Sequence, residues 1–148
     1  MNDKAFIDTN VLIYLYSVDE FEKRNISQTA VDTYDCIIST QVLNEFCNVC
    51  IKKLNKTTDE IKLAVEEIIG QCAVTKIERE HISQALETHK KYGYGYFDCL
   101  MIVSALNSGC KYLLTEDMND GQLIDEKLTI VNIYAQAYPA CTKKGGGL

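Results

Sequence analysis

Short apolar runs alternate with helix-length segments along almost the whole chain, and this alternation limits the fold more than any other feature. Each run is short enough for a strand, and the segments between the runs carry helical spacing and capping residues. The expected strands cover residues 5–7, 36–39, 73–77, 111–115 and 128–133. Strands joined by helix-length crossovers pair in parallel. We therefore expect an α/β fold: one Rossmann-like, three-layer domain in which helices flank a central parallel sheet of about five short strands.

Local signals mark where several of the helices begin or end. Thr57 and Glu60 have the spacing of a capping box, and Gly109 is placed to end the last expected helix. The expected helices cover residues 11–16, 21–33, 40–54, 57–69, 78–92 and 99–106. The glycine-rich end of the chain has no such signals, so we expect one domain over residues 1–138 and a flexible tail over residues 139–148.

Length and composition exclude several classes of protein. The chain has 148 residues, 47% of them apolar, which suits one soluble globular domain. No apolar run reaches the roughly 18 residues that a membrane-spanning helix needs, and Asp8 interrupts the first apolar stretch, which excludes a secretory signal. The seven scattered cysteines then indicate reduced thiols in the cytoplasm. The net charge of −6 argues against nucleic-acid binding through overall charge, but it allows a local site where a metal ion reverses the sign.

Acidic residues stand where the chain leaves expected strands or enters an expected helix. Asp8 follows the first strand, Asp117 follows the fourth, and Asp98 opens the most apolar helix. Glu45 lies at the edge of the apolar stripe of the helix that follows the second strand. In isolation each position has an ordinary explanation, such as an N-cap, a first-turn acid, a solvated rim residue or a turn. In a parallel sheet, however, three of the positions converge at the carboxyl ends of the strands, where ligands bind.

Converging carboxylates repel one another, which raises their pKa values unless a cation compensates the charge. Ligand sets made only of oxygen favour Mg²⁺ or Mn²⁺, and such ions commonly also bind substrate phosphates. One or two of these ions can generate and orient hydroxide for attack on a phosphodiester. The acidic positions therefore predict a divalent-metal site with hydrolytic chemistry.

Four short motifs, in the same order along the chain, resemble those of PIN-domain proteins. They are Asp8-Thr9-Asn10 with the apolar residues after it, Asn44-Glu45-Phe46, Phe97-Asp98 before an apolar helix, and Leu114-Thr115-x-Asp117. The resemblance extends from about residue 4 to residue 134 and is greatest to the VapC-like toxin ribonucleases of toxin–antitoxin pairs. It implies a Mg²⁺- or Mn²⁺-dependent endoribonuclease that cleaves single-stranded RNA, forms a homodimer and is inhibited by a cognate antitoxin protein.

The resemblance also implies roles for individual residues. The acids that would hold the metal ion are Asp8, Glu45, Asp98 and Asp117. The side chains that would orient these carboxylates through hydrogen bonds are Thr9, Asn10 and Thr115. Asp120 is a further acid near the expected site, although family members vary at this position.

Two other features suit RNA binding but have ordinary explanations as well. Lys52, Lys53 and Lys56 come after Glu45, where they can follow a phosphate backbone or simply form a solvated helix end. Tyr94 belongs to a glycine-spaced run of tyrosines that matches no family motif. Its ring can stack on an unpaired base, or it can pack in the core or at a dimer contact.

Other functions fit the sequence less well. A catalytically silent PIN-like module that binds RNA or protein is the main alternative, and the presence of all four acids argues against it. A phosphatase of the haloacid dehalogenase type needs a second aspartate where this chain has Asn10. A receiver-type phosphoacceptor domain needs paired acids upstream of Asp8. The Cys47-x-x-Cys50 pair has no second pair and predicts packing rather than zinc binding.

Overall fold

The computed structural model describes residues 2–136, so the tail predicted over residues 139–148 lies outside the described residues. Within them, six strands form one sheet in the order β3-β2-β1-β4-β6-β5. The strands are β1 (Lys4–Ile7), β2 (Asp35–Ser39), β3 (Ala73–Thr75), β4 (Tyr112–Leu114), β5 (Leu123–Ile124) and β6 (Leu128–Val131). The same residues form the helices α1 (Thr9–Leu15), α2 (Phe21–Thr33), α3 (Thr40–Lys52), α4 (Thr58–Gln71), α5 (Arg79–Tyr92), α6 (Tyr96–Asn107) and α7 (Ile133–Gln136).

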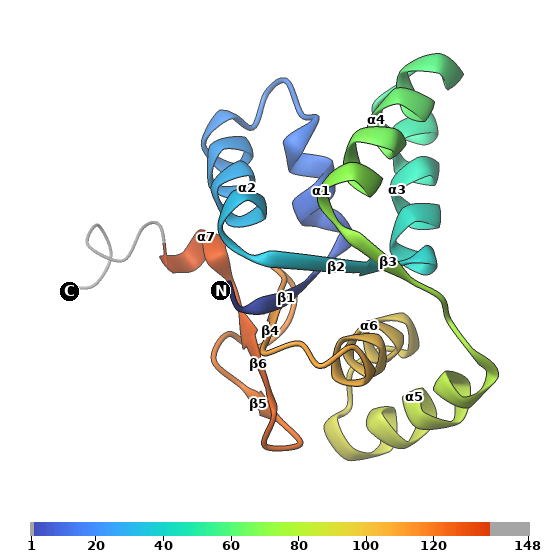
Figure 1. Cartoon of the computed structure of the whole chain (residues 1–148), viewed down its shortest axis with the longest axis vertical. Coiled ribbons are helices and arrows are strands. Elements are labelled where there is room, and N and C mark those ends of the chain that lie inside the picture. The colour runs from blue at the N-terminus through green and yellow to red at the C-terminus, as the bar shows by residue number, and fades with distance from the viewer. Residues whose placement is uncertain (1, 137–148) are drawn as a thin grey trace.

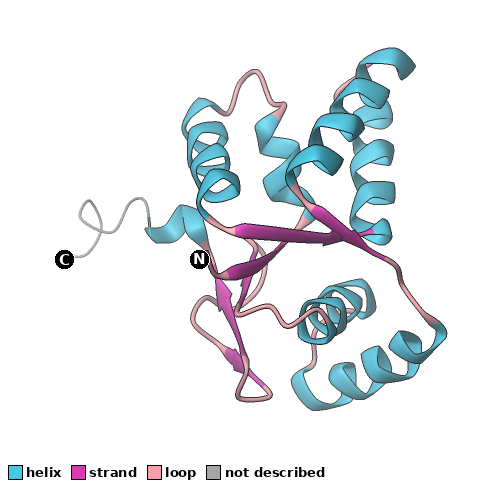
Figure 2. Ribbon diagram, in the orientation of Figure 1, coloured by secondary structure: helices cyan, strands magenta, loops and turns pink. Residues whose placement is uncertain are grey.

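Parallel pairing dominates the sheet, as the alternation of strands and helices predicts. β1 pairs in parallel with β2 and β4, β2 pairs with β3, and β4 pairs with β6. Figure 1 and Figure 2 show the three layers, with α1 to α4 on one side of the sheet and α5 and α6 on the other. The predicted three-layer α/β fold is therefore confirmed, and β1 and β4 lie side by side at its centre.

The structure corrects the predicted sheet at its edges. β5 is an additional two-residue strand that pairs antiparallel with β6. The sequence did not indicate β5, because two residues between turns carry no periodicity. The strand predicted over residues 128–133 ends at Val131, because Ile133 begins α7. Both of these corrections lie beyond β4, and at the opposite edge the strand predicted over residues 73–77 ends at Thr75.

The two central strands are buried from both sides. Ala5, Phe6 and Ile7 of β1 and Leu113 and Leu114 of β4 are completely inaccessible to solvent. Continuous apolar runs are expected for strands with helices on both faces, and each large side chain so buried contributes about 1.5–3 kcal/mol. Because β1 and β4 run in the same direction, the residues that follow them emerge at one edge of the sheet.

Local capping determines where the helices begin and end. Asp8 caps α1 and Ser39 caps α3, so both helices start at the carboxyl ends of strands. The predicted capping box is present on α4: Thr57 Oγ1 accepts from the Glu60 N–H at 3.1 Å, and Glu60 accepts from the Thr57 N–H at 2.8 Å. Gly109 follows α6 with a φ of +73°, a left-handed conformation that glycine adopts at little cost.

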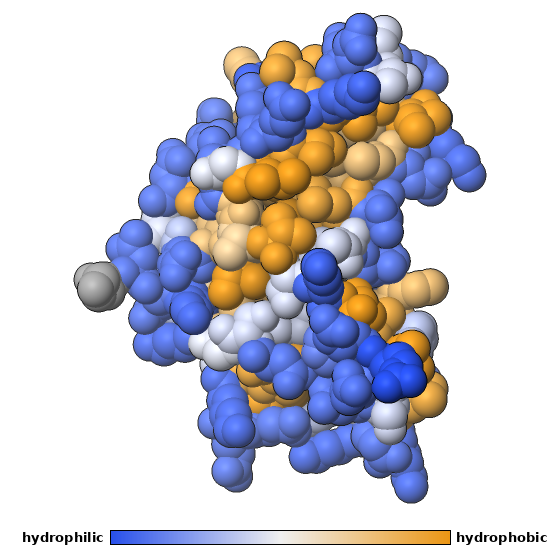
Figure 3. Space-filling view, turned by 45° about the vertical axis from the view of Figure 1, so that its right-hand side comes forward, coloured by the Kyte–Doolittle hydropathy of each residue, from blue (hydrophilic) through white to orange (hydrophobic). Residues whose placement is uncertain are grey.

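Between residues 2 and 136, none of the helices is both long enough and apolar enough to cross a membrane. Figure 3 shows a largely hydrophilic surface on which apolar side chains gather in the upper part of the molecule, over the layer formed by α1 to α4. Leu63 and Ile69 of α4 and the nearby Val18 are among the exposed apolar residues. Val18 also lines a groove of about 630 Å³ between α1, α2 and α4.

Candidate active site

Asp8 is the most buried of the four predicted acids. It follows β1 directly, caps α1 and is only 5% exposed. Its Oδ1 accepts a hydrogen bond from the Thr9 backbone N–H at 2.6 Å, and its Oδ2 accepts one from Thr115 Oγ1 at 2.6 Å. Both donors are neutral, so they orient the Asp8 carboxylate without compensating its charge.

Thr9 connects the start of α1 to α3. Its hydroxyl donates to Glu45 Oε1 at 2.8 Å, and Gln41 Nε2 donates to Glu45 Oε2 at 3.3 Å. Val42 and Phe46, on the same helix, are buried, whereas Glu45 is only partly buried. Glu45 therefore lies at the boundary of the apolar face of α3, with its carboxylate held towards α1.

Asp117 and Asp98 approach Asp8 from two further elements. In the loop after β4, Asp117 Oδ2 accepts from Asn10 Nδ2 at 2.9 Å, and the Asp117 N–H donates to Thr115 Oγ1 at 3.2 Å. Thr115 thus bonds to both Asp8 and Asp117, and it joins the ends of β1 and β4. Asp98 lies in the first turn of α6 and is partly buried.

The charges of the neighbouring acids affect the ionisation of Asp8 and Asp98. Burial raises the pKa of Asp8 from its ordinary value of 3.8 to about 6, against the lowering effect of its two hydrogen bonds, and the charges of Asp117 and Asp98 raise it further. Burial also raises the pKa of Asp98, and the charges of Asp117 and Glu45 add to that effect. Along the described chain, no lysine, arginine or histidine forms an ion pair with any of the four. The site therefore gathers negative charge without a cation from the protein.

The donor set suits a hard divalent cation, because it consists of carboxylate oxygens only. In the region from residue 2 to residue 136, however, no group of three or more histidine, cysteine or acidic side chains is arranged to hold a metal ion. Three of the carboxylates are instead engaged by neutral donors from Thr9, Asn10 and Thr115. The observation in favour of a metal ion is thus the uncompensated negative charge around Asp8. To bind the ion, the carboxylates would have to turn from their present hydrogen-bond donors towards it.

Sequence reasoning missed a cluster beside Asp117. Glu116 accepts hydrogen bonds from the Tyr14 hydroxyl at 2.6 Å and from Lys23 Nζ at 2.5 Å, and Lys23 Nζ lies 4.9 Å from the centre of the Tyr14 ring. Burial opposes ionisation of Glu116, but the hydrogen bonds from Lys23 and Tyr14 outweigh it and lower its pKa. These residues come from α1, α2 and the loop after β4, so no local motif connects them.

Two other predicted residues stabilise the loop after β4. The Tyr94 hydroxyl donates to Gln122 Oε1 and accepts from the Asn119 N–H at 3.1 Å. Asp120 Oδ1 accepts from the Asn132 N–H at 2.8 Å. Throughout residues 2–136, neither side chain is hydrogen-bonded to any of the four acids, so both have structural contacts of their own.

The three predicted lysines lie at the far end of α3. This helix begins at the edge of the sheet that carries the acids, and Lys52 comes two turns after Glu45, about 10 Å further along the axis. Lys52 and Lys53 are exposed, and Lys56 is partly buried. The structure does not bring these lysines together with the acids.

Comparisons with known proteins match nearly the whole described region. The family model for the PIN domain matches residues 5–137. Comparison with curated protein sequences gives no match.

Three solved structures illustrate the similarity of fold. A toxin–antitoxin complex from Klebsiella pneumoniae is 18% identical with a TM-score of 0.66, and the match covers 88% of this chain and 98% of that chain. FitAcB from Neisseria gonorrhoeae is 14% identical with a TM-score of 0.63, covering 88% and 98%. VapC20 from Mycobacterium tuberculosis, a sarcin–ricin loop cleaving toxin, is 15% identical with a TM-score of 0.60, covering 74% and 86%. At these identities the likeness shows a common fold.

Proposed function

This chain belongs to the PIN-domain family, and on that basis we propose that it is a divalent-metal-dependent endoribonuclease that hydrolyses phosphodiester bonds of single-stranded RNA. One observation carries the proposal: acids from four separate parts of the chain lie close enough that the charges of Asp117 and Asp98 raise the pKa of Asp8, and the charges of Asp117 and Glu45 raise the pKa of Asp98. Asp8, the most buried of them, has no cationic partner between residues 2 and 136. A divalent cation would supply the missing positive charge.

The proposed metal ligands are the four carboxylates of Asp8, Glu45, Asp98 and Asp117. A bound Mg²⁺ or Mn²⁺ would supply an acidified water molecule and stabilise the negative charge that develops on the leaving oxygen. Neutral donors hold three of these carboxylates at the edge of the sheet: Thr9, Asn10 and Thr115. Such donors also keep carboxylate ligands correctly oriented in metal sites, so we assign them that role here. We assign no metal contact to Asp120.

The solved structures support the proposed partners. One similar structure is a toxin–antitoxin complex, and another is a toxin that cleaves the sarcin–ricin loop. By analogy, we propose that this chain is the toxin of a toxin–antitoxin pair, that it acts on RNA in the cytoplasm as a homodimer, and that a cognate antitoxin protein inhibits it. We propose that residues 1–138 form the nuclease domain.

Contacts with RNA outside the acidic site are a separate part of the proposal. RNA that continues along α3 for about 10 Å from Glu45 would reach Lys52 and Lys53, and Lys56 lies in the turn after the helix, where its N–H donates to the Cys50 carbonyl. The hydroxyl of Tyr94 is held by the loop after β4 and its partly buried ring packs against the core, so stacking on a base would use only the exposed part of the ring.

Replacement of one proposed ligand tests the nuclease directly. Asp98→Asn removes a negative charge with almost no change of shape. We expect the wild-type chain to cleave single-stranded RNA only when Mg²⁺ or Mn²⁺ is present, and to lose this activity in EDTA. Asp98→Asn should lower the cleavage rate roughly 100-fold or more. The measurement is the rate of cleavage of an end-labelled RNA on a sequencing gel.

Asp59→Asn is the matched control, because Asp59 is an exposed acid in the first turn of α4. It undergoes the same chemical change in the same kind of helical position, so it should cleave at the wild-type rate. Cleavage by Asp98→Asn at the rate of the control would refute the proposal. RNA binding without cleavage at any Mg²⁺ or Mn²⁺ concentration would identify the silent binding module instead.

A further inference from the structure

Cys36 and Cys72 form a pair of free thiols at the opposite ends of the strands from the four acids. β2 and β3 pair in parallel with Ile37 opposite Ala73, so Cys36 and Cys72, one residue upstream, are the next two residues in register. Neighbouring strands lie about 4.8 Å apart, and a disulfide needs a Cα separation of roughly 4.4–6.8 Å. The pairing of the strands alone therefore brings the two cysteines within disulfide range.

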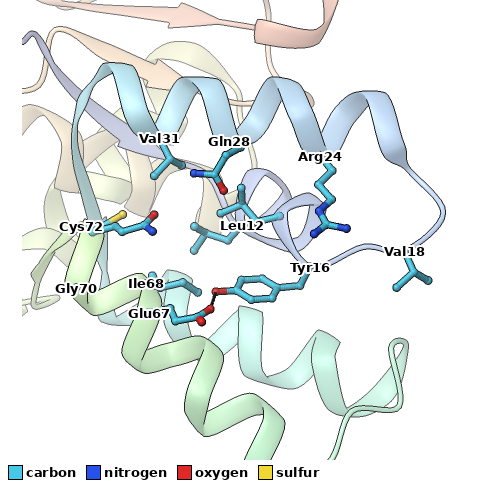
Figure 4. Close-up of a pocket in the computed structure, with 12 residues that line it drawn as sticks. Leu12, Tyr16, Val18, Arg24, Gln28, Val31, Glu67, Ile68, Gly70 and Cys72 are labelled. Carbon is cyan, nitrogen blue, oxygen red and sulfur yellow. Dashed lines mark hydrogen bonds between the residues drawn. The ribbon is translucent and has the colours of Figure 1, made fainter.

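Both thiols lie on the side of the sheet that carries α2. The sulfur of Cys36 is 3.5 Å from the carbonyl oxygen of Val31 and 3.5 Å from that of Tyr34, at the end of α2. Val31 and Cys72 both line the groove between α1, α2 and α4, and Figure 4 shows them at the same end of it. Cys36 is 2% exposed and Cys72 is 5% exposed, and of the two only Cys72 lines this groove, so a small molecule would have to approach the pair at Cys72.

The two thiols differ in acidity because they interact with each other. The hydrogen bond between them lowers the pKa of Cys72, in spite of burial, and raises the pKa of Cys36. Cys36 already donates its thiol proton to the carbonyl oxygens of Val31 and Tyr34, whereas Cys72 is the cysteine that lines the groove. Since the thiolate is the form that attacks a disulfide, these contacts and the access through the groove select Cys72 as the attacking residue.

We propose that Cys36 and Cys72 are a redox modification site, which forms a reversible disulfide with a low-molecular-weight disulfide such as oxidised glutathione as the oxidant. The Cys72 thiolate attacks one sulfur of the oxidant, the S–S bond of the oxidant breaks, and one glutathione thiolate leaves. Cys36 then loses its proton to water and attacks the Cys72 sulfur of the mixed disulfide, which releases the second glutathione. Two cysteine thiols are thereby oxidised, and one disulfide is reduced to two thiols.

The new bond would close a loop from residue 36 to residue 72, which contains α3 and α4. A cross-link across a loop of this length restricts the unfolded chain, so the oxidised protein should melt roughly 5–10 °C higher than the reduced protein. The inference does not depend on nuclease activity, because neither cysteine belongs to the acidic site.

Peptide mapping of the full chain tests the proposal. The protein is incubated with oxidised glutathione, its remaining thiols are blocked with N-ethylmaleimide, and it is digested with a protease that cleaves after glutamate. Such cleavage places Cys36 in the peptide 23–45 and Cys72 in the peptide 68–78, and it leaves Cys47 and Cys50 in the peptide 46–60. We expect a non-reduced species that joins 23–45 to 68–78 and disappears on reduction with dithiothreitol.

Variants show whether the bond is specific. Cys36→Ser and Cys72→Ser should each abolish the linked species and the rise in melting temperature. The double variant Cys47→Ser with Cys50→Ser is the matched control and should retain both. Oxidised wild-type protein in which 23–45 and 68–78 carry only glutathione or maleimide would overturn the proposal. A disulfide that joins the peptide 68–78 to the peptide 46–60 would overturn it too. Both results are obtained with the wild-type protein, so they do not depend on whether the variants fold.

Discussion

The carboxylate of Asp8 lies where its negative charge is energetically unfavourable. Its carboxylate is buried, its two hydrogen-bond donors are neutral, and Asp117 and Asp98 add negative charge nearby. A pKa of about 6 in the folded chain, compared with 3.8 for an ordinary aspartate, means that the folded state binds the proton more tightly than the unfolded state. Without a metal ion, ionisation of Asp8 therefore destabilises the fold.

The sign of this effect predicts how the stability depends on pH in EDTA. Below about pH 4, Asp8 is protonated in both the folded and the unfolded state. Between about pH 4 and pH 6, Asp8 ionises only in the unfolded state. The free energy of unfolding therefore falls by up to about 3 kcal/mol as the pH rises through this range. Asp8→Asn removes this loss, and we expect it to be about 1–3 kcal/mol more stable than the wild type at pH 7.5. The measurement is urea unfolding at pH 4.5 and pH 7.5.

Asp59→Asn again provides the control. Because this residue is exposed, the variant should show the same difference in the free energy of unfolding between pH 4.5 and pH 7.5 as the wild type. If Asp8→Asn were less stable than the wild type at pH 7.5, its hydrogen bonds would outweigh its burial, and the explanation of the raised pKa would be wrong.

The elements around the site are held together by few side chains, of which Glu116 is one. It joins the loop after β4 to Tyr14 of α1 and Lys23 of α2, while the adjacent Asp117 bonds to Asn10 of α1. The side chains of Lys23 and Glu116 are 28% and 23% exposed, so solvent screens their attraction less than it screens a surface pair. This cluster keeps the loop that carries Asp117 against α1.

A double-mutant cycle measures the contribution of the cluster. We expect Lys23→Met and Glu116→Gln each to destabilise the fold by about 1–2 kcal/mol, with a coupling energy of about 1 kcal/mol between them. The measurement is the free energy of unfolding in urea at low salt. Lys91 and Asp125, whose side chains are 65% and 42% exposed, form a matched ion pair whose cycle should give a clearly smaller coupling energy. Equal coupling in both cycles would show that burial adds nothing to the Glu116 contact.

The elements themselves were largely predictable, because their signals are local. Continuous apolar runs indicated the central strands, and the Thr57 capping box and Gly109 marked helix ends that the structure contains. β5 and α7 were not predicted, since two- and four-residue elements carry too little periodicity.

Prediction of the site depended on the same distinction between local and distant signals. The acids at the ends of β1 and β4 could be expected to converge, because parallel strands end at one edge. The contact of Lys23 with Glu116 could not be predicted, since it joins positions 93 residues apart and no motif connects them. The lysines at and after the end of α3 were predicted from helical alignment alone, which does not show how far from the strand ends they lie.

At the scale of the whole molecule, a metal ion at the site would link elements from both faces of the sheet. The four acids follow β1, follow β4, lie on α3 and lie on α6, so the ion would bind the folded chain only. Any ligand with that preference stabilises the fold by an amount that grows with its concentration. The melting temperature therefore reports metal binding independently of catalysis.

We expect Mn²⁺ at about 100 times its dissociation constant to stabilise the wild-type chain by about 2.7 kcal/mol, which corresponds to a rise in melting temperature of roughly 10 °C. Asp98→Asn should lose most of this rise, and Asp59→Asn should retain it. Differential scanning calorimetry with and without Mn²⁺ gives the values. The same rise in all three proteins would place the bound ion outside the four acids, whereas a rise without RNA cleavage would indicate a silent module that binds metal.

The order of the strands also has a consequence for synthesis of the protein. Asp8 leaves the ribosome 107 residues before Thr115, its hydrogen-bond partner across the sheet, and β6, which flanks β4, emerges later still. A growing polypeptide therefore lacks the complete acidic centre until the loop after β4 has been made. If the chain is a nuclease, the ribosome that makes it and the message that encodes it are spared until that loop has emerged.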